Sequence, residues 1–231
     1  MDVNFEYINP FDEKYDYLMR AEHLGRYFLA ADVLKGFNKV LDVACADGYG
    51  TGLLSKNVSK IVGVDRDKDY LEIAQKKYGD ENIEFKCIDV DTSEITDMYD
   101  GIVCFETLEH LKHPEVLLRN LYKILSEDGV LLLSIPNSNY EIIENGKNQD
   151  SFHLHVFEYD TIIDLIRKVG FNIEKVYGQS YINGIVNKEI TDYHLTDIIN
   201  DAKTIAYPNE DEIEKTYSYI FILNKRVDPN E

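Results

Sequence analysis

Short apolar runs alternate along this chain with segments whose apolar residues recur every three or four positions. Continuous apolar runs are typical of strands buried on both faces of a sheet, and they predict strands over 40–44, 61–64, 83–87, 102–105 and 130–135. The longer spacing predicts amphipathic helices over 15–34, 50–57, 67–78 and 114–125. Because strands and helices alternate, we expect an α/β fold with a doubly wound, mostly parallel sheet and right-handed crossovers.

The last third of the chain follows the same pattern with one interruption. A helix over 160–169 precedes a strand over 172–177, and the run "SYIFIL" at 218–223 predicts a final strand. Between these strands, 178–215 mixes polar and apolar residues, and only 195–205 has a helical spacing. We therefore expect one domain over 1–231, with 1–36 as an N-terminal helical cap and 178–215 as a variable insertion.

Charge narrows the range of partners. The 231 residues include 24 basic and 43 acidic side chains, which gives a formal net charge of −19. A field of this sign repels polyphosphates, so nucleic acids and anionic membrane surfaces are poor partners.

The ends and the cysteines indicate the compartment. The N-terminal stretch "MDVNFEYINPF" lacks the basic and apolar regions of a signal peptide, and no apolar run approaches the ~20 residues of a membrane span. Cys45, Cys87 and Cys104 lie in or beside apolar runs, which is typical of small buried hydrophobic residues in a reducing compartment. We expect a cytoplasmic protein.

Acidic residues follow three successive predicted strands. Asp42 lies within "VLDVACADGYG", Asp65 ends "VGVD", and Asp89 follows "FKCI". The carboxyl ends of parallel strands share one edge of the sheet, where doubly wound folds bind their ligands. The three carboxylates are therefore expected at one ligand-binding edge.

Two classes of cofactor fit such an edge differently. The nicotinamide fingerprint is G-x-G-x-x-G after the first strand, whereas Gly48, Gly50 and Gly52 form G-x-G-x-G. That fingerprint has no role for Asp42 or Asp89. A cofactor with a cationic amine, a ribose and an adenine would use an acid at each strand, which favours this second class.

Taken in order, "VLDVACADGYG", "VGVDRD", "CIDVD", "FETLEHL" and "LLLSIPNSNY" resemble the motifs of class I S-adenosylmethionine-dependent methyltransferases. The resemblance runs from about Val40 to Asn139. In addition, "EHLGRY", "FHLHVFE" and "YGQS" resemble a bacterial subgroup associated with glycan and other small-molecule biosynthesis. The resemblance implies a Rossmann-like sheet of seven strands in the order 3-2-1-4-5-7-6, with the last strand antiparallel.

The resemblance also implies which residues contact S-adenosylmethionine. The first turn and the fourth strand would surround the methionine part, the second strand the ribose, and the third strand the adenine. The implied contacts are Asp42, Ala44, Ala46, Gly48, Phe105 and Glu106 for the methionine part, Asp65 for the ribose hydroxyls, and Arg66, Asp89 and Val90 for the adenine.

The first turn departs from the family pattern at two glycine positions, which are Ala44 and Ala46 here. Glycine is used where φ is positive or where the backbone approaches a ligand closely. Alanine at a positive φ costs about 1 kcal/mol. We expect Ala44 to be a mild change and Ala46 to be the more serious one.

Methyl transfer to a hydroxyl or an amine requires the acceptor to lose a proton, so one general base near the methyl group is useful. Histidine is the default base near neutral pH, and His153, followed by His110, is the expected catalytic residue. His153, His155 and Glu158 together also suggest a metal site, but we favour a base and expect no metal. His23 and Arg26 lie on the predicted N-terminal helix. They either cap the cofactor or contact the substrate, or they belong only to the solvated face of that helix.

The sequence therefore predicts an enzyme that transfers a methyl group to an oxygen or nitrogen of a small molecule. The subgroup resemblance implies a sugar, nucleotide-sugar or glycan-linked acceptor, with 178–215 on the substrate side. Two alternatives remain, a protein that binds the cofactor without catalysis, suggested by Ala46, and a nicotinamide-dependent oxidoreductase.

Overall fold

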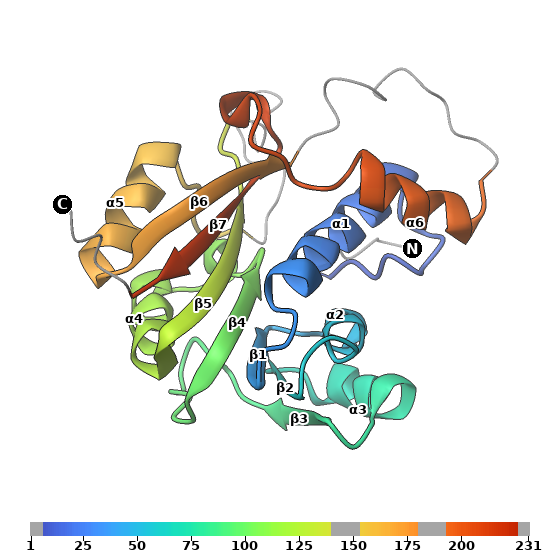
Figure 1. Ribbon diagram of the computed structural model, residues 1–231, viewed down its shortest axis with the longest axis horizontal. Helices are drawn as coiled ribbons and strands as arrows, with labels where there is room; N and C mark the ends of the chain where they lie inside the picture. The colour runs from blue at the N-terminus through green and yellow to red at the C-terminus, as the bar shows by residue number, and fades with distance from the viewer. Residues whose placement is uncertain (1–6, 140–152, 180–192, 226–231) are drawn as a thin grey trace.

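The computed structural model describes residues 7–139, 153–179 and 193–225, which form a seven-stranded sheet in the order β3-β2-β1-β4-β5-β7-β6 (Figure 1). Strand β7 is antiparallel to both of its neighbours, and the pairs among β1 to β5 are parallel. The expected fold and strand order are confirmed. The strands are β1 (Lys39–Val43), β2 (Lys60–Asp65), β3 (Ile83–Cys87), β4 (Tyr99–Phe105), β5 (Leu125–Pro136), β6 (Asn172–Gln179) and β7 (Ser218–Asn224).

The helices also follow the predicted order. The α-helices are α1 (Tyr17–Val33), α2 (Tyr49–Leu54), α3 (Lys68–Tyr78), α4 (Pro114–Ile124), α5 (Tyr159–Val169) and α6 (Leu195–Thr204), and the short 3-10 helices are η1 (Leu108–His110) and η3 (Ile213–Lys215). Strands β4 and β5 begin earlier than expected, since their first residues include Asp100 and the polar stretch 126–128. Only the buried centres of these two strands are continuously apolar. A search for continuous apolar runs therefore finds the centres and not the polar first residues.

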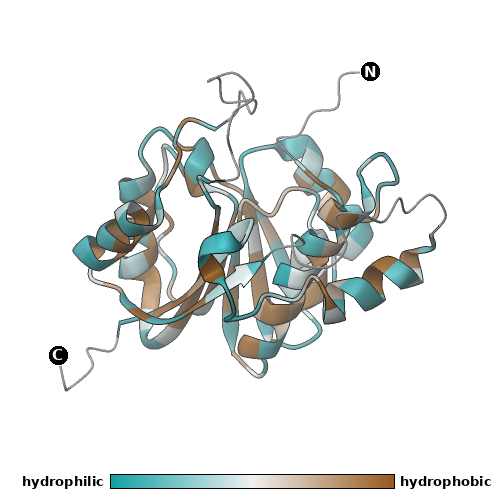
Figure 2. Ribbon diagram, turned by 90° about the horizontal axis from the view of Figure 1, so that it is seen from above, coloured by the Kyte–Doolittle hydropathy of each residue, from teal (hydrophilic) through white to brown (hydrophobic). Residues whose placement is uncertain are grey.

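Two hydrophobic layers enclose the sheet. On one face, α4 and α5 cover β1, β4 and β5, with Leu118 and Ile166 fully buried. On the other face, α1 and α2 cover the sheet, with Ala30 and Leu54 fully buried. Figure 2 shows the apolar strands between helices whose outer faces are polar. Because successive strand residues point to opposite faces, Asp42 lies on the same face as Val40, toward α1 and α2.

Strand β3 differs from the expected burial. Its residues are half-buried or exposed, and Cys87, expected to be buried, is exposed. The strand order explains this difference, because β3 lies at the edge of the sheet and Glu84 and Lys86 alternate with its apolar residues. An edge strand exposes its polar side chains and needs no continuous apolar run.

The N-terminal helix and the last α-helix pack together. Ala21 and Leu24 of α1 and Ile198 and Ala202 of α6 belong to one buried cluster, and the hydroxyl of Tyr17 donates a 2.5 Å hydrogen bond to Asp201. Figure 1 shows the two helices side by side beyond the carboxyl ends of the parallel strands. No helix in the described ranges is long and apolar enough to cross a membrane.

Candidate active site

Asp42 is buried near the end of the inner strand β1. Its side chain has no exposed surface, and it accepts hydrogen bonds from Thr51 Oγ1 at 2.6 Å and from the Tyr27 hydroxyl at 3.2 Å. Burial raises the pKa of this carboxyl to about 7, against the lowering effect of the two hydroxyl donors. Asp42 is thus a poorly solvated acid that ionises near neutral pH.

The turn after β1 has a left-handed backbone at three positions. Ala44, Ala46 and Gly48 have φ angles of 56°, 46° and 78°. The expectation that Ala44 is the milder departure from glycine is wrong, because both alanines adopt the conformation that favours glycine. Ala44 is exposed and Ala46 half-buried, so neither Cβ is tightly enclosed. The turn thus keeps the conformation of a glycine-rich turn with alanine at two of its three left-handed positions.

Asp65 is bonded to the turn. Its two carboxylate oxygens accept 2.8 Å hydrogen bonds from the backbone N–H groups of Ala46 and Asp67. Burial raises its pKa, while the two backbone donors act in the opposite direction. The end of β2 therefore holds the middle of the first turn in place.

The adenine-side residues continue along the same edge. Asp89 accepts a 3.0 Å hydrogen bond from the backbone N–H of Asp91, and Val90 is partly buried against the larger hydrophobic cluster. Arg66 is exposed next to Asp65. Asp42 in β1, Asp65 at the end of β2 and Asp89 after β3 thus lie near the carboxyl ends of three adjacent strands, as expected from the parallel pairing.

Glu106 connects the end of β4 to the N-terminal helix. It has a φ angle of 44° and accepts a 2.6 Å hydrogen bond from Ser134 Oγ, and the Arg26 guanidinium lies 3.6 Å from the same carboxylate oxygen. Arg26 also donates to Gln179 and to Ser218, each at 3.4 Å. Arg26 is 3% exposed and connects α1 to the sheet through these contacts. It therefore does not lie on a solvated helix face.

Two further residues of α1 lie in this buried polar layer. Burial raises the pKa of Glu22 to about 8, with Arg26 lowering it and Glu106 and Asp16 raising it. Burial, assisted by Arg26, lowers the pKa of His23 well below its usual value, and the ring lies 3.3 Å from the Tyr49 hydroxyl. Neutral His23 therefore packs against the helix that follows the turn.

The two candidate bases lie together. The rings of His110 and His153 meet edge to face with centroids 4.7 Å apart, although 42 residues separate them in the sequence. His155 stacks instead on Phe157 at 5.8 Å, and Glu158 is exposed at the start of α5. The combination of His153, His155 and Glu158 considered from the sequence is not assembled; Glu109 takes the place of the acid beside the two histidines.

The sequence did not identify several residues of the site. Thr51 and Tyr27 bind Asp42, Ser134 binds Glu106, and Gln179 joins α1 to β6. Glu109 lies within "ETLEHL", but an acid in a short helix after a strand has no distinctive spacing that would predict a role. These residues become recognisable only through their contacts.

Similarity to known proteins agrees with this arrangement. Residues 11–176 match the model of a methyltransferase domain. Over 98 residues, the chain is 36% identical to a malonyl-[acyl-carrier protein] O-methyltransferase of Bacillus cereus, which covers 42% of this chain and 36% of that protein. Over 119 residues, it is 29% identical to a ubiquinone biosynthesis O-methyltransferase of Coxiella burnetii, which covers 50% of each. The aligned region thus spans half or less of the length of these curated relatives.

Solved structures share the fold over nearly the whole chain. An S-adenosylmethionine-dependent methyltransferase from Clostridium acetobutylicum superposes with a TM-score of 0.64 at 13% identity, covering 91% of this chain and 92% of that one. The N-methyltransferase NodS from Bradyrhizobium japonicum, in complex with S-adenosyl-L-homocysteine, gives 0.60 at 14% identity, covering 93% and 90%. With its strand order and its match over 11–176, the chain belongs to the S-adenosylmethionine-dependent methyltransferase family.

Proposed function

We propose that this protein transfers the methyl group of S-adenosylmethionine to an oxygen or nitrogen of a small molecule, with oxygen as the preferred atom. The observation that carries the proposal is the row of acids at the ends of β1, β2 and β3 beside a left-handed turn. Both curated relatives described above are named O-methyltransferases, which favours oxygen. The family resemblance of the motifs favours a sugar, nucleotide-sugar or glycan-linked acceptor.

The donor set along this edge fits the cofactor. Each oxygen of Asp65 accepts one backbone N–H, and a carboxylate oxygen has a second lone pair for a ribose hydroxyl. The turn from Ala44 to Gly48, together with the carboxylates of Asp42 and Glu106, suits a methionine end that carries an ammonium and a sulfonium. Asp89, with Val90 and Arg66, would bind the adenine.

The chain's own contribution to the reaction is positioning and proton removal. When bound, the cofactor would supply an electrophilic sulfonium methyl group with a neutral thioether as the leaving group. Such a leaving group needs little activation, so orientation and exclusion of water are the main tasks of the protein. His153 and His110 lie beyond the end of β4, where one imidazole would accept the proton of an acceptor hydroxyl.

We further propose that the acceptor is enclosed by the N-terminal cap, 1–36, and the insertion, 178–215. In the described parts of these segments, α1 and α6 share a buried cluster, and Gln179 donates to the carbonyls of Glu22 and Ala206. Tyr193 lies edge to face with Tyr17 at 4.7 Å. Residues 180–192 of the insertion, which include Tyr181, lie outside the described residues.

The packing of the glycines bears on the nicotinamide alternative. A Cβ on Gly50 would lie 2.0 Å from the Tyr27 ring, and one on Gly52 would lie 2.6 Å from the Tyr78 ring. Both glycines are accounted for by close helix packing, so no pyrophosphate contact is needed to explain them. The retained left-handed backbone at Ala46 likewise supports cofactor binding and weakens the argument for a protein that has lost turnover.

Calorimetric titration with S-adenosylmethionine, S-adenosyl-L-homocysteine and NAD tests the proposal. We expect the two sulfur compounds to bind at one site per chain and NAD not to bind. A screen of hydroxylated and amino acceptors, followed by release of S-adenosyl-L-homocysteine, then tests turnover. Binding of NAD alone would overturn the cofactor assignment, and cofactor binding without any methylated product would support the non-catalytic alternative.

A further inference from the structure

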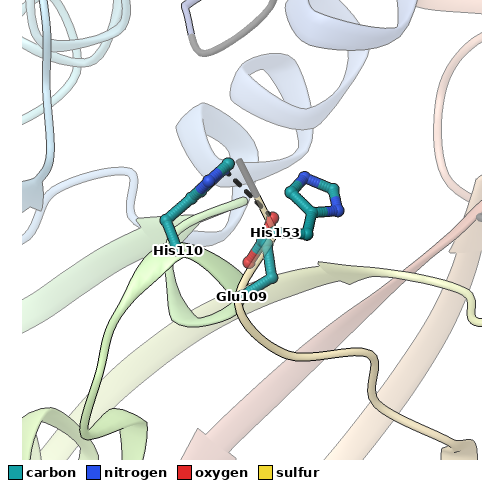
Figure 3. A group of neighbouring side chains, drawn as sticks. All are labelled: Glu109, His110 and His153. Atoms are coloured by element: carbon teal, nitrogen blue, oxygen red, sulfur yellow. Dashed lines mark ion pairs between the residues drawn. The ribbon is translucent and has the colours of Figure 1, made fainter. Parts of the chain in front are cut away.

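Glu109, His110 and His153 form a compact cluster beyond the end of β4. One ligand atom from each residue, a carboxylate oxygen and two imidazole nitrogens, lies within 4.8 Å of the other two. The Glu109 carboxylate lies 3.9 Å from His110 Nε2. Figure 3 shows the three side chains pointing toward one another from η1 and from the segment that precedes α5.

The main chain holds the two parts of this cluster in register. The carbonyl oxygen of Glu109 accepts hydrogen bonds from the N–H groups of Leu154 at 2.7 Å and His155 at 3.1 Å. The segment carrying His153 is therefore attached to the 3-10 helix that carries the other two side chains. Their proximity follows from this backbone pairing as well as from the contact between the rings.

The burial of the three residues differs in a way that suits an ion reached from one side. Glu109 is 1% exposed, while His110 and His153 are half-buried. A divalent cation between the carboxylate and the imidazoles would be held by Glu109 on the buried side and would remain accessible to a further ligand on the side of the half-buried imidazoles.

We propose that Glu109, His110 and His153 bind a divalent transition-metal ion of the zinc or manganese type. Two imidazoles and one carboxylate are a common donor set for such ions, whereas Mg²⁺ and Ca²⁺ prefer oxygen alone. Bond lengths of about 2.1 Å in tetrahedral geometry place ligand atoms roughly 3.4 Å apart. The side chains would close by on the order of 1 Å, which small χ rotations provide.

The role of this ion rests on the methyl transfer proposed above. Three protein ligands leave at least one coordination position open, as in catalytic metal sites. A metal ion lowers the pKa of an oxygen bound to it, so an acceptor hydroxyl held there would lose its proton to water more readily. The ion would therefore select oxygen acceptors. With the ion bound, the two histidines act as ligands and water takes the proton of the acceptor, whereas in the metal-free chain one imidazole takes it.

Metal titration of the full chain tests the site directly. After treatment with a chelator and its removal, calorimetry with Zn²⁺, Mn²⁺ and Mg²⁺ is expected to show one transition-metal ion per chain and at least tenfold weaker binding of Mg²⁺. Co²⁺ should give visible absorption bands of a site with nitrogen ligands. Absence of stoichiometric binding of Zn²⁺, Mn²⁺ and Co²⁺ would overturn the proposal.

Substitutions locate the ion. His110→Ala and His153→Ala are each expected to weaken Zn²⁺ binding by at least tenfold, whereas His113→Ala, at an exposed histidine in the same region, should leave it unchanged. Glu109→Gln should weaken Zn²⁺ binding to a similar extent. Because Glu109 is buried, this variant could fail to fold, in which case the two histidine variants still decide the test. Equal Zn²⁺ binding in wild type, His110→Ala and His153→Ala would place the ion elsewhere and overturn the assignment.

Two measurements separate this proposal from the proposed function and from simple packing. The metal-free chain should bind S-adenosyl-L-homocysteine as tightly as the loaded chain, so failure of cofactor binding would count against the methyltransferase proposal alone. Added Zn²⁺ should raise the melting temperature of wild type, because an ion that binds only the folded state stabilises it. A lower melting temperature in both histidine variants, with no effect of Zn²⁺ on wild type, would assign the cluster to packing and overturn the metal site.

Discussion

The carboxyl edge of the sheet has two halves that are organised differently. The cofactor half comprises the ends of β1, β2 and β3 with the turn 44–48, and its acids are bonded to nearby backbone N–H groups and buried hydroxyls. The histidine half comprises η1 and 153–157, and joins residues about 40 positions apart in sequence. The first half is fixed by strand ends and a turn, and the second by tertiary contact.

This difference suggests that one half of the edge binds the cofactor and the other half handles the acceptor. A constant cofactor requires a preorganised turn, which the hydrogen bond from Ala46 N–H to Asp65 provides. An acceptor that differs among relatives requires groups on segments whose sequence is free to change, since loops positioned by a rigid scaffold tolerate variation. The following predictions test whether the cofactor half is as rigid, as charged and as dependent on its turn as its contacts indicate.

The largest expected effect is a dependence of stability on pH. Burial raises the pKa of Glu22 to about 8 and that of Asp42 to about 7. A raised carboxyl pKa means that the folded state binds more protons than the unfolded state, so the stability that these two groups contribute is full below about pH 4 and is lost as pH rises toward 8. Glu22 alone would account for up to about 4 kcal/mol.

Urea unfolding of the cofactor-free protein at pH 5 and pH 8 measures this loss. Glu22→Gln should flatten the dependence and make the variant more stable than wild type at pH 8, while Asp42 maintains part of the slope. Glu13→Gln, at an exposed glutamate, serves as the control and should follow wild type. Equal stability of the wild-type protein at both pH values would contradict the raised pKa values of Glu22 and Asp42.

Packing of the turn helix against α1 should give the next largest effect. In Gly50→Ala, the new Cβ would lie 2.0 Å from the Tyr27 ring, whose hydroxyl binds Asp42. Overpacking of this kind costs about 3 kcal/mol. Chemical denaturation should show the loss, while Gly36→Ala, with a φ of 84° and nothing within 4 Å, should lose only about 1 kcal/mol from backbone strain. Similar losses in both variants would mean that the contact with Tyr27 is unimportant.

Loss of the ribose acid should affect binding more than folding. Asp65→Ala removes charge-assisted hydrogen bonds and should weaken the binding of S-adenosyl-L-homocysteine by about 2 kcal/mol, roughly 30-fold. Calorimetry measures the change. Asp69→Ala, which removes an exposed charge close by on α3, is the matched control and should bind normally. An unchanged affinity in Asp65→Ala would show that the ribose lies elsewhere.

The smallest expected effect concerns the alanines of the turn. Ala46→Gly should stabilise the protein by about 0.5–1 kcal/mol, because glycine relieves the strain at a φ of 46°. Ala31→Gly, inside helix α1, should change stability in the opposite direction by about 1 kcal/mol. Thermal unfolding compares the signs. Destabilisation by both substitutions would indicate that the left-handed conformation costs alanine nothing here.

The sequence alone determined the order of strands and helices and the acids at their ends. Continuous apolar runs indicated buried strands, and parallel pairing then placed Asp42, Asp65 and Asp89 at one edge regardless of the details of packing. The pattern predicted the bounds of β3 correctly but not its burial, since the edge position of this strand exposes Cys87. An apolar run predicts that a strand is buried. Whether that strand lies at the edge of the sheet, and is therefore partly exposed, depends on the order of the strands.

Only the tertiary structure decided which side chains act together. The pairing of Arg26 with Glu106, the hydroxyls of Tyr27 and Thr51 on Asp42, and the meeting of Glu109 and His110 with His153 all join separate segments. Strand ends share an edge because backbone hydrogen bonding is periodic, so their positions follow from local sequence. Contacts between distant side chains depend on how the intervening chain is packed, and no spacing within the sequence encodes that distance.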